Sequence, residues 1–489
     1  GGSFGTVNPS LAWDKILGAV SLRASAEYLG SRGNYPYQYF DTTLVRENGD
    51  IRSLRAETQL FGRIKKGEWR LHLYGYGSER GFPGPVIRRA QGFPLSAERQ
   101  EDLNVFVQGS WRRDWTDRYS TALRLKYAND YTHYDTHLEK NPMAMPYNLH
   151  FRQQSAYISE AQSYSLSDTW SVDLSTDIQY NALDSDVGQN VAPRRTSFTG
   201  ALAGRYVTDK LRLAAHVAYT GSYDEYEITN AGGWSRENAW RDAWMPSASV
   251  AWLPLEWLEL DAFIKRSYRL PSFNDLYYSL MGNSSLEPES AFQAGVDLNL
   301  HAVRSNWIWD GRVSPYYNRV DNKIVAIPTS SQFRWTMLNI GIADITGLDL
   351  KGGMTFSKND LAASLVLRYT FQQALDHSTP GSQTYGNQLP YIPVHSGSAD
   401  LSLSWRRWTF LWDTRLTGEK WSRSANIDDY RIAPWSVSDA SLSCECVKNQ
   451  ILSISASLRL SNVFDYRYQI VQGYPMPGRS ILACIDISF

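Results

Sequence analysis

Cysteine is scarce in this chain, long apolar runs are missing and the net charge is close to zero. Three cysteines among 489 residues cannot build a disulfide framework. Cys444 and Cys446 share the apolar face of an alternating segment, so we interpret them as small lipid-facing residues and not as metal ligands. No stretch approaches the ~18 apolar residues of a membrane-spanning helix. A net charge of −1 leaves no basic excess for binding nucleic acid.

The composition favours a protein that crosses a bilayer with strands. The chain holds 18 Trp, 30 Tyr and 17 Phe, yet its mean hydropathy is only −0.41. A transmembrane β-barrel has this composition because half of its strand residues face lipid and half face a wet lumen. The sequence begins without a signal peptide, so we expect a mature or truncated chain.

The last eleven residues, 479–489, alternate between apolar and mostly polar positions up to a final aromatic residue. Successive side chains of a strand point to opposite faces, so the segment predicts a strand with one apolar face. The apolar positions are Ile481, Ala483, Ile485, Ile487 and Phe489. This tail resembles the C-terminal signal by which outer-membrane β-barrels are recognised for assembly. The alternative is the terminal strand of a soluble sandwich.

The same alternation recurs along the chain and places charged residues on the second face of many segments. Residues 361–371 and 452–461 show it clearly. A dry sandwich core would not tolerate these charges unpaired, whereas a wide lumen does. Inward arginines that are candidates to hold acidic groups of a plug are Arg124, Arg205, Arg212, Arg368, Arg415 and Arg459.

The connections between the expected strands alternate between short and long. Short turns are expected at 65–68, 208–210, 357–360, 406–407 and 448–450, and long loops near 32–50, 82–99, 134–150, 227–242, 270–289, 377–395 and 422–435. This sorting is typical of outer-membrane barrels, whose single chains have an even number of strands. About 21 full strands can be counted, the first at roughly 7–14. We therefore expect a barrel of about 22 strands whose first strand is truncated within Gly1–Thr6.

Four segments resemble, in order, motifs of the barrel of TonB-dependent outer-membrane receptors. Residues 266–290, RSYRLPSFNDLYYSLMGNSSLEPES, are similar to the family's FRAPSFNELY…GNPNLKPE stretch. The others lie at 338–350, 389–395 and 461–480, and the resemblance runs from residue 2 to Phe489. The family-motif residues singled out as candidates are Arg269, Pro271, Asn274, Asn283, Leu286, Pro288 and Glu289.

Within that family the chain is most similar to receptors for vitamin B12 and related corrinoids, especially those with SERGFPGPV, here at 78–86. The resemblance implies an all-β fold, with one large transmembrane antiparallel barrel over 1–489, in the outer membrane of a Gram-negative bacterium. It implies active uptake of a scarce large nutrient, a corrinoid first and an iron-siderophore second. The family's N-terminal plug and TonB box are not in this sequence. The implied partners are the plug domain, the TonB system, outer-membrane lipid and a surface lipoprotein.

Aromatic residues in the long loops are the candidate ligand contacts, because such rings stack on a large planar or amphipathic ligand. They are Tyr35, Tyr37, Tyr223, Tyr226, Trp234, Tyr277 and Tyr278. The alternative is that these rings belong to the aromatic girdle at the membrane edge. B12-type calcium sites use acidic loops, and 129–135 offers Asn129, Asp130 and Asp135, although solvated loop acids are the commoner case. We expect no resident cofactor.

Two other functions stay open on the sequence. A passive channel without a plug fits the missing N-terminal segment, and a surface-binding barrel would use only the long loops. No nucleophile motif such as G-x-S-x-G is present, so we expect no catalytic residues and no enzyme.

Overall fold

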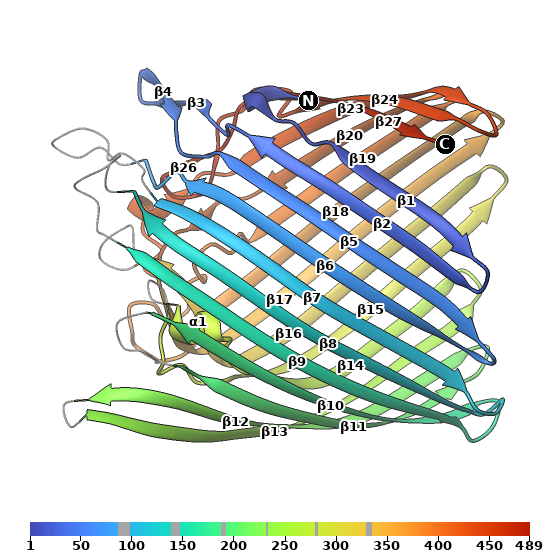
Figure 1. Cartoon of the computed structure of the whole chain (residues 1–489), viewed down its shortest axis with the longest axis vertical. Helices are drawn as coiled ribbons and strands as arrows, with labels where there is room; N and C mark the ends of the chain where they lie inside the picture. Colours follow the sequence, from blue (N-terminus) through green and yellow to red (C-terminus); the bar gives the residue numbers. More distant parts are fainter. Residues whose placement is uncertain (87–97, 138–146, 187–191, 231–232, 279–281, 329–334) are drawn as a thin grey trace.

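A single antiparallel sheet of 21 strands wraps into a barrel (Figure 1). The computed structural model describes residues 1–86, 98–137, 147–186, 192–230, 233–278, 282–328 and 335–489, with backbone alone at 227–230, 233–236, 328 and 335. Neighbouring strands are neighbours in sequence and pair antiparallel, as a chain of hairpins requires. The prediction of a large antiparallel barrel is confirmed.

The barrel strands lengthen toward the middle of the chain. They are β1 (Ser10–Leu17), β2 (Val20–Ser31), β5 (Ile51–Ile64), β6 (Gly67–Phe82), β7 (Glu98–Asp114), β8 (Tyr119–Thr136), β9 (Asn148–Ser165), β10 (Trp170–Ser185), β11 (Arg194–Val207), β12 (Leu211–Asn230), β13 (Gly233–Leu255), β14 (Leu258–Arg269), β15 (Glu289–Arg304), β16 (Trp307–Pro328), β17 (Trp335–Lys358), β18 (Leu361–Asp376), β19 (His395–Trp405), β20 (Trp408–Thr417), β23 (Trp435–Lys448), β24 (Ser453–Ser461) and β27 (Ser480–Ser488).

The remaining elements are small and belong to the connections. Three short hairpins are formed by β3 (Tyr35–Tyr39) with β4 (Thr42–Arg46), β21 (Lys420–Trp421) with β22 (Arg431–Ile432), and β25 (Gln469–Val471) with β26 (Tyr474–Pro475). The helical elements are α1 (Phe273–Tyr277) and two 3-10 turns at Ser3–Gly5 and Asp428–Tyr430. Among the described residues, no helix is long and apolar enough to cross a membrane.

Side chains alternate between an apolar outer face and a polar inner face. Leu174 pairs with Leu202 on adjacent strands, and about half of each side chain is exposed on the outer wall. Phe489 continues the apolar face of β27 and is 97% exposed. Ten of the 18 tryptophans lie in or within a few residues of a short turn: Trp69, Trp111, Trp115, Trp170, Trp252, Trp257, Trp307, Trp309, Trp405 and Trp408. An apolar wall with an aromatic girdle at one rim identifies the membrane-embedded surface.

The short turns fall where the sequence predicts them. Lys66, Asn359 and Arg406 each adopt a positive φ in a two-residue turn, at 56°, 51° and 54°. Such left-handed positions match the twist of the flanking strands and close tight hairpins. All the expected short turns therefore lie at one rim, and the long connections lie at the other.

Three sequence expectations about boundaries are wrong. The first full strand is Ser10–Leu17 and not 7–14. Residues 227–230 and 233–242 do not lie in a long loop; they belong to β12 and β13, which pair up to Asn230 and Gly233. Residues 129–135 lie inside β8 and not in a loop. In the last two cases the strand continues beyond the segment that has a clear apolar face.

The two ends of the sheet meet only through the N-terminal segment. Gly2 bridges Leu482, and Gly1 exchanges two backbone hydrogen bonds with Ala483, at 2.9 and 3.0 Å. Beyond these contacts, β1 and β27 form no ladder with each other in the described part of the chain. Each of these strands therefore has a free edge, and the truncated first strand stays a prediction.

The inner wall carries ion pairs, most of them between adjacent strands. Five of the six inward arginines expected to hold a plug already pair with an acidic residue of the wall: Arg205 with Asp173, Arg212 with Glu259, Arg368 with Asp400, Arg415 with Asp413 and Arg459 with Asp439. No such pair involves Arg124 among the described residues. These pairs are half-exposed to the lumen, so each contributes little to stability.

We expect the free edges to be the weakest part of the wall. Amides on the outer edges of β1 and of β27 after Ala483 should exchange with deuterium at least about tenfold faster than those of β16 and β17, which are paired on both sides. The measurement is hydrogen exchange with mass spectrometry on the 489-residue chain in detergent. Equal protection in both regions would show that another segment covers these edges.

Candidate functional site

The connection from β14 to β15 folds inward at the long-loop rim and carries α1. Ser272 caps this helix: its hydroxyl accepts from the Asp275 amide at 3.2 Å, and the Asp275 carboxylate accepts from the Ser272 amide at 2.9 Å. This reciprocal capping fixes a five-residue helix that would not be stable alone. Pro271, directly before the cap, is among the most deeply buried residues of the described chain.

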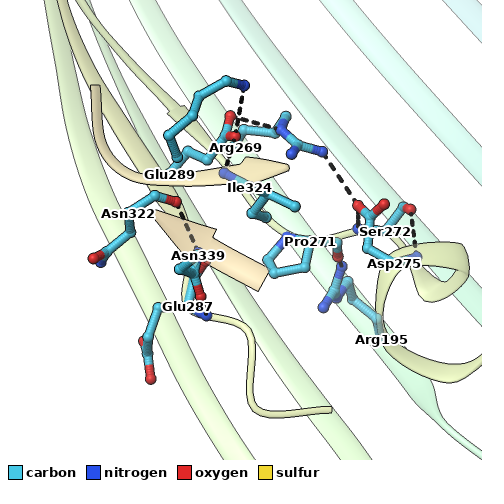
Figure 2. A network of polar contacts seen from close by, with 11 residues as sticks. Arg195, Arg269, Pro271, Ser272, Asp275, Glu287, Glu289, Asn322, Ile324 and Asn339 are labelled. Atoms are coloured by element: carbon cyan, nitrogen blue, oxygen red, sulfur yellow. Dashed lines mark hydrogen bonds and ion pairs between the residues drawn. The ribbon is translucent and has the colours of Figure 1, made fainter. Parts of the chain in front are cut away.

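Arg269 and Glu289, the last residue of β14 and the first of β15, form the hub of this connection (Figure 2). Arg269 donates to Glu289 at 2.9 Å and to Asp275 at 3.2 Å. The other oxygen of Glu289 accepts from Lys323 at 2.9 Å and from the Ile324 amide at 2.6 Å. The carboxylate thus ties the start of the loop, the helix cap and β16 together.

A second, buried ion pair ties the loop to β11 and β12, which lie on the other side of β14 from β16. Arg195 of β11 donates twice to Asp224 of β12, at 2.6 and 2.7 Å, and once to the Pro271 carbonyl at 2.7 Å. Its guanidinium also lies 5.3 Å from the Phe273 ring, and Arg241 adds a contact to Asp224 at 2.9 Å. The side chains of Arg195 and Asp224 are 8% and 4% exposed. The sequence reasoning missed both residues.

Two of the other motif residues, Asn283 and Leu286, also hold the loop in place. Asn283 donates to the Met337 carbonyl at 2.9 Å, and Leu286, 1% exposed, packs in a cluster with Leu276 and Ile324. Pro288 is half-buried beside Glu289, whereas Asn274 is exposed on α1. The structure therefore brings the motif together as a latch that holds the loop.

Tyr277 and Tyr278 lie at the end of the latch, against the inner wall. The Tyr278 ring stacks on Phe151 at 4.2 Å, and Tyr277 contacts Phe273 edge-on at 5.7 Å. Burial raises the pKa of Tyr277 to about 12, so its phenol stays protonated at neutral pH. Both rings pack with their own loop and wall, and their contact with a ligand stays a prediction.

The three aromatic candidates of the β12–β13 hairpin do not converge on one site. Tyr223 points outward, opposite Thr196 and Trp240, and is 38% exposed. Tyr226 has the inward parity of Asp224 on the same strand. The side chain of Trp234 lies outside the described residues. Only Tyr226 of this set shares a face with the latch.

A group of tyrosines surrounds Arg46 on the other side of the mouth. The Tyr35 hydroxyl donates to the Pro475 carbonyl at 2.8 Å, and the Arg46 guanidinium lies 5.5 Å from the Tyr474 ring. Arg46 is 6% exposed, binds the Pro83 carbonyl and forms no ion pair with a described carboxylate. Burial raises the pKa values of Tyr35 and Tyr474, so both phenols remain neutral. Tyr37 lies on the same hairpin, and we call Tyr35, Tyr37, Arg46 and Tyr474 the mouth cluster.

The candidate calcium residues do not converge. Asp130 faces inward and accepts from Asn104 at 2.8 Å, whereas Asn129 faces outward and accepts from Arg152 at 3.2 Å. Asp135 lies 3.2 Å from His137. Within the described part of the chain, no group of three or more metal-binding side chains is arranged around one point. Calcium in another loop stays a prediction.

Comparisons with known proteins agree on one family. A family model described as TonB dependent receptor-like, beta-barrel, matches residues 30–463. The vitamin B12 transporter BtuB of Vibrio vulnificus is 30% identical over 100 residues, which are 20% of this chain and 15% of that protein. The vitamin B12 transporter BtuB of Photobacterium profundum is 22% identical over 235 residues, 47% of this chain and 36% of the relative. These matches therefore span well under half of either relative.

Solved structures show the same fold at low sequence identity. The siderophore receptor PiuA from Acinetobacter baumannii superposes with a TM-score of 0.78 at 12% identity, over 100% of this chain and 80% of that one. The copper transporter OprC gives a TM-score of 0.78 at 14% identity, over 100% and 79%. Identity this low supports the architecture and does not identify a ligand.

We expect Arg195→Met to release the latch. The variant removes the donor to the Pro271 carbonyl and leaves the buried Asp224 carboxylate with Arg241 as its remaining partner, so the free energy of opening the 270–289 loop should fall by about 1.5–3 kcal/mol. The measurement is hydrogen exchange of the amides of 272–288. Arg205→Met is the matched control, because Arg205 pairs with Asp173 at 2.7 Å but is 50% exposed, and it should change this energy by less than about 1 kcal/mol. Similar effects of the two variants would contradict the latch.

Proposed function

Because the chain belongs to the TonB-dependent receptor β-barrel family, we propose that it forms the barrel of an active outer-membrane importer for a scarce nutrient too large for porins. The family consists of outer-membrane receptors and transporters of Gram-negative bacteria and not of enzymes. We propose that this chain lies in the same membrane, that a plug domain fills its lumen and that it is coupled to the TonB system. A surface lipoprotein is a further proposed partner.

We propose a corrinoid as the first ligand and an iron-siderophore as the second. The observation that carries this proposal is the mouth cluster, in which neutral phenols surround a buried guanidinium without a described carboxylate partner. Aromatic rings stack on a large planar ligand, and a guanidinium binds a phosphate or another anionic group. Vitamin B12 offers a planar ring with amide side groups and a phosphodiester, and the two curated relatives are B12 transporters. Ferric siderophores offer anionic and aromatic groups to the same residues.

A passive channel is the second candidate, supported by the ion-paired inner wall, which suits a water-filled lumen as well as a plug. The two functions differ in whether a ligand at the mouth affects ion flow. In planar bilayers, we expect cyanocobalamin added on the long-loop side to reduce the conductance of the chain. Conductance that is indifferent to cyanocobalamin and to ferric siderophores would favour the passive channel.

We expect Tyr37→Ala to weaken ligand binding about tenfold, the effect of losing one stacked ring worth ~1.4 kcal/mol. Tyr37 is the suitable position because its side chain forms no hydrogen bond with a described residue that would hold the hairpin. The measurement is equilibrium dialysis of the purified chain with cyanocobalamin and, in parallel, with a ferric catecholate. Tyr180→Ala is the control, since Tyr180 is on the outer wall and 43% exposed.

Comparing the two ligands distinguishes a corrinoid importer from an iron-siderophore importer. Tight binding of the catecholate alone would contradict a corrinoid ligand and would support an importer of iron-siderophores. Unchanged cyanocobalamin affinity in Tyr37→Ala would show that the mouth cluster is not part of the ligand-binding site.

A further inference from the structure

Arg113 is a charged side chain on the lipid-facing side of the wall, next to the short turn between β7 and β8. The outward positions of β7 are the odd-numbered ones, since Leu103, Val105 and Val107 are exposed on the apolar face. The ladders of β7 with β6 and with β8 have no bulge, so the same alternation places Arg113 outward. A guanidinium therefore lies on the face that meets lipid, one residue before β7 ends.

Two indoles flank Arg113 along the chain. The guanidinium lies 4.3 Å from the centre of the Trp115 ring, and Trp115 contacts Trp111 edge-on at 6.2 Å. The Trp115 indole is held in place, because its N–H donates to the Thr121 hydroxyl at 3.1 Å. Tryptophan is enriched where a membrane meets water. The group therefore lies at the level of the lipid headgroups in the leaflet on the short-turn side.

Arg113 has no anionic partner among the described residues. The acids of this rim pair with other bases: Glu68 with Arg70 at 3.1 Å, Asp114 with Arg112 at 3.5 Å and Asp117 with Lys66 at 3.3 Å. Glu160 of β9 has the same outward parity, but β8 lies between, and Glu160 accepts from Gln162 at 2.9 Å. The Arg113 Nε atom is buried and has no hydrogen-bond partner in the described chain. The charge and this donor are therefore uncompensated.

The neighbours of Arg113 on the lipid-facing side are uncharged. Gly67 lies directly opposite on β6 and has no side chain that could pair with the guanidinium. Trp111 lies between Trp69 and Leu123 on the adjacent strands. These apolar side chains continue from the guanidinium into the membrane-embedded wall. A ligand with a phosphate and long acyl chains therefore fits this face better than a free phosphate does.

Two adjacent short turns add positive charge around Arg113. The Asp114 amide donates to the Lys66 carbonyl at 2.7 Å, which joins the β7–β8 turn to the β5–β6 turn. Lys65 and Arg118 are exposed in these turns and form no ion pair with a described residue. The excess of positive charge favours an anionic headgroup over a zwitterionic one.

We propose that Arg113 binds the phosphate of an anionic phospholipid in the leaflet on the short-turn side of the barrel. The planar guanidinium donates to two phosphate oxygens, and Trp115 holds it in position from the opposite side. The acyl chains of the lipid lie along Trp111 and Leu123. The site rests on the proposed location in the outer membrane and is independent of the nutrient that the barrel binds at its mouth.

The test is native mass spectrometry of the detergent-solubilised 489-residue chain titrated with dioleoyl phosphatidylglycerol. We expect Arg113→Met to weaken binding of the first lipid about tenfold, because a charge-assisted contact is lost. Arg112→Met is the matched control: it removes the same charge one residue away, but from an inward side chain paired with Asp114 at 3.5 Å, and should change the affinity by less than about twofold. Arg113→Lys keeps the charge without the planar fork and should weaken binding by about threefold.

Dioleoyl phosphatidylcholine tests the headgroup. We expect the unmodified chain to bind phosphatidylglycerol at least about tenfold tighter than phosphatidylcholine, and Arg113→Met to lose this preference. Equal affinity for the two lipids would overturn the proposal. Equal losses in Arg112→Met and Arg113→Met would also overturn it, since they would show a general effect of charge. Displacement of the lipid by inorganic phosphate would show that a soluble anion is the ligand.

A melting curve in phosphatidylcholine separates a lost site from a damaged fold. We expect Arg113→Met to melt at the temperature of the unmodified chain, because its guanidinium forms no ion pair with a described residue. If Arg113→Met melts earlier, the Arg113→Lys variant decides: unchanged phosphatidylglycerol affinity in a chain that melts normally would contradict a phosphate held by the guanidinium fork.

Discussion

Backbone hydrogen bonding inside the membrane is the constraint on which this structure depends. The bilayer interior offers no water, so a backbone amide or carbonyl of the wall is costly unless it pairs with a neighbouring strand, and among the described strands only β1 and β27 have a free edge. Period-two alternation, two-residue turns at Lys66 and Arg406, and the bridge from Gly2 to Leu482 all follow from closing such a sheet. The constraint ends where the wall leaves the membrane, and there the strands and connections differ from one another in length and conformation.

Burial decides which of the many ion pairs hold the fold. Arg205 with Asp173 and Arg195 with Asp224 have almost the same N–O distances. The first pair faces the lumen half-exposed, where screening leaves it worth little. The second is covered by Pro271 and Phe273, so removing Asp224 would leave the buried Arg195 charge uncompensated, whereas removing Arg195 would leave Asp224 with Arg241 alone. The latch therefore depends on two residues that no motif marks.

The amino-acid pattern predicts the membrane-embedded part of the fold well and the rim poorly. Residues 361–371 and 481–489 alternate because one face meets lipid, and the structure confirms their faces. The segments 129–135 and 227–242 lack an apolar face, since their strands continue where both faces meet water, and the pattern therefore predicts loops there. The motif residues of 269–289 are identified by resemblance, but the contact from Arg195 joins positions far apart in sequence.

The absence of a lipid-facing surface above the membrane also explains why the candidate sites lie at the rim. A residue on the wall is constrained by lipid on one side and by the lumen on the other, which leaves little freedom for a ligand or a partner. Above the membrane, water satisfies exposed backbone groups, so strand pairing can end at different heights, as it does for β13 with β14 at Ser247. Loops can also turn inward and bury charges such as Arg46 among neutral rings. Recognition by this barrel is therefore expected to differ most from that of its relatives in the part of the chain where the period-two pattern fades.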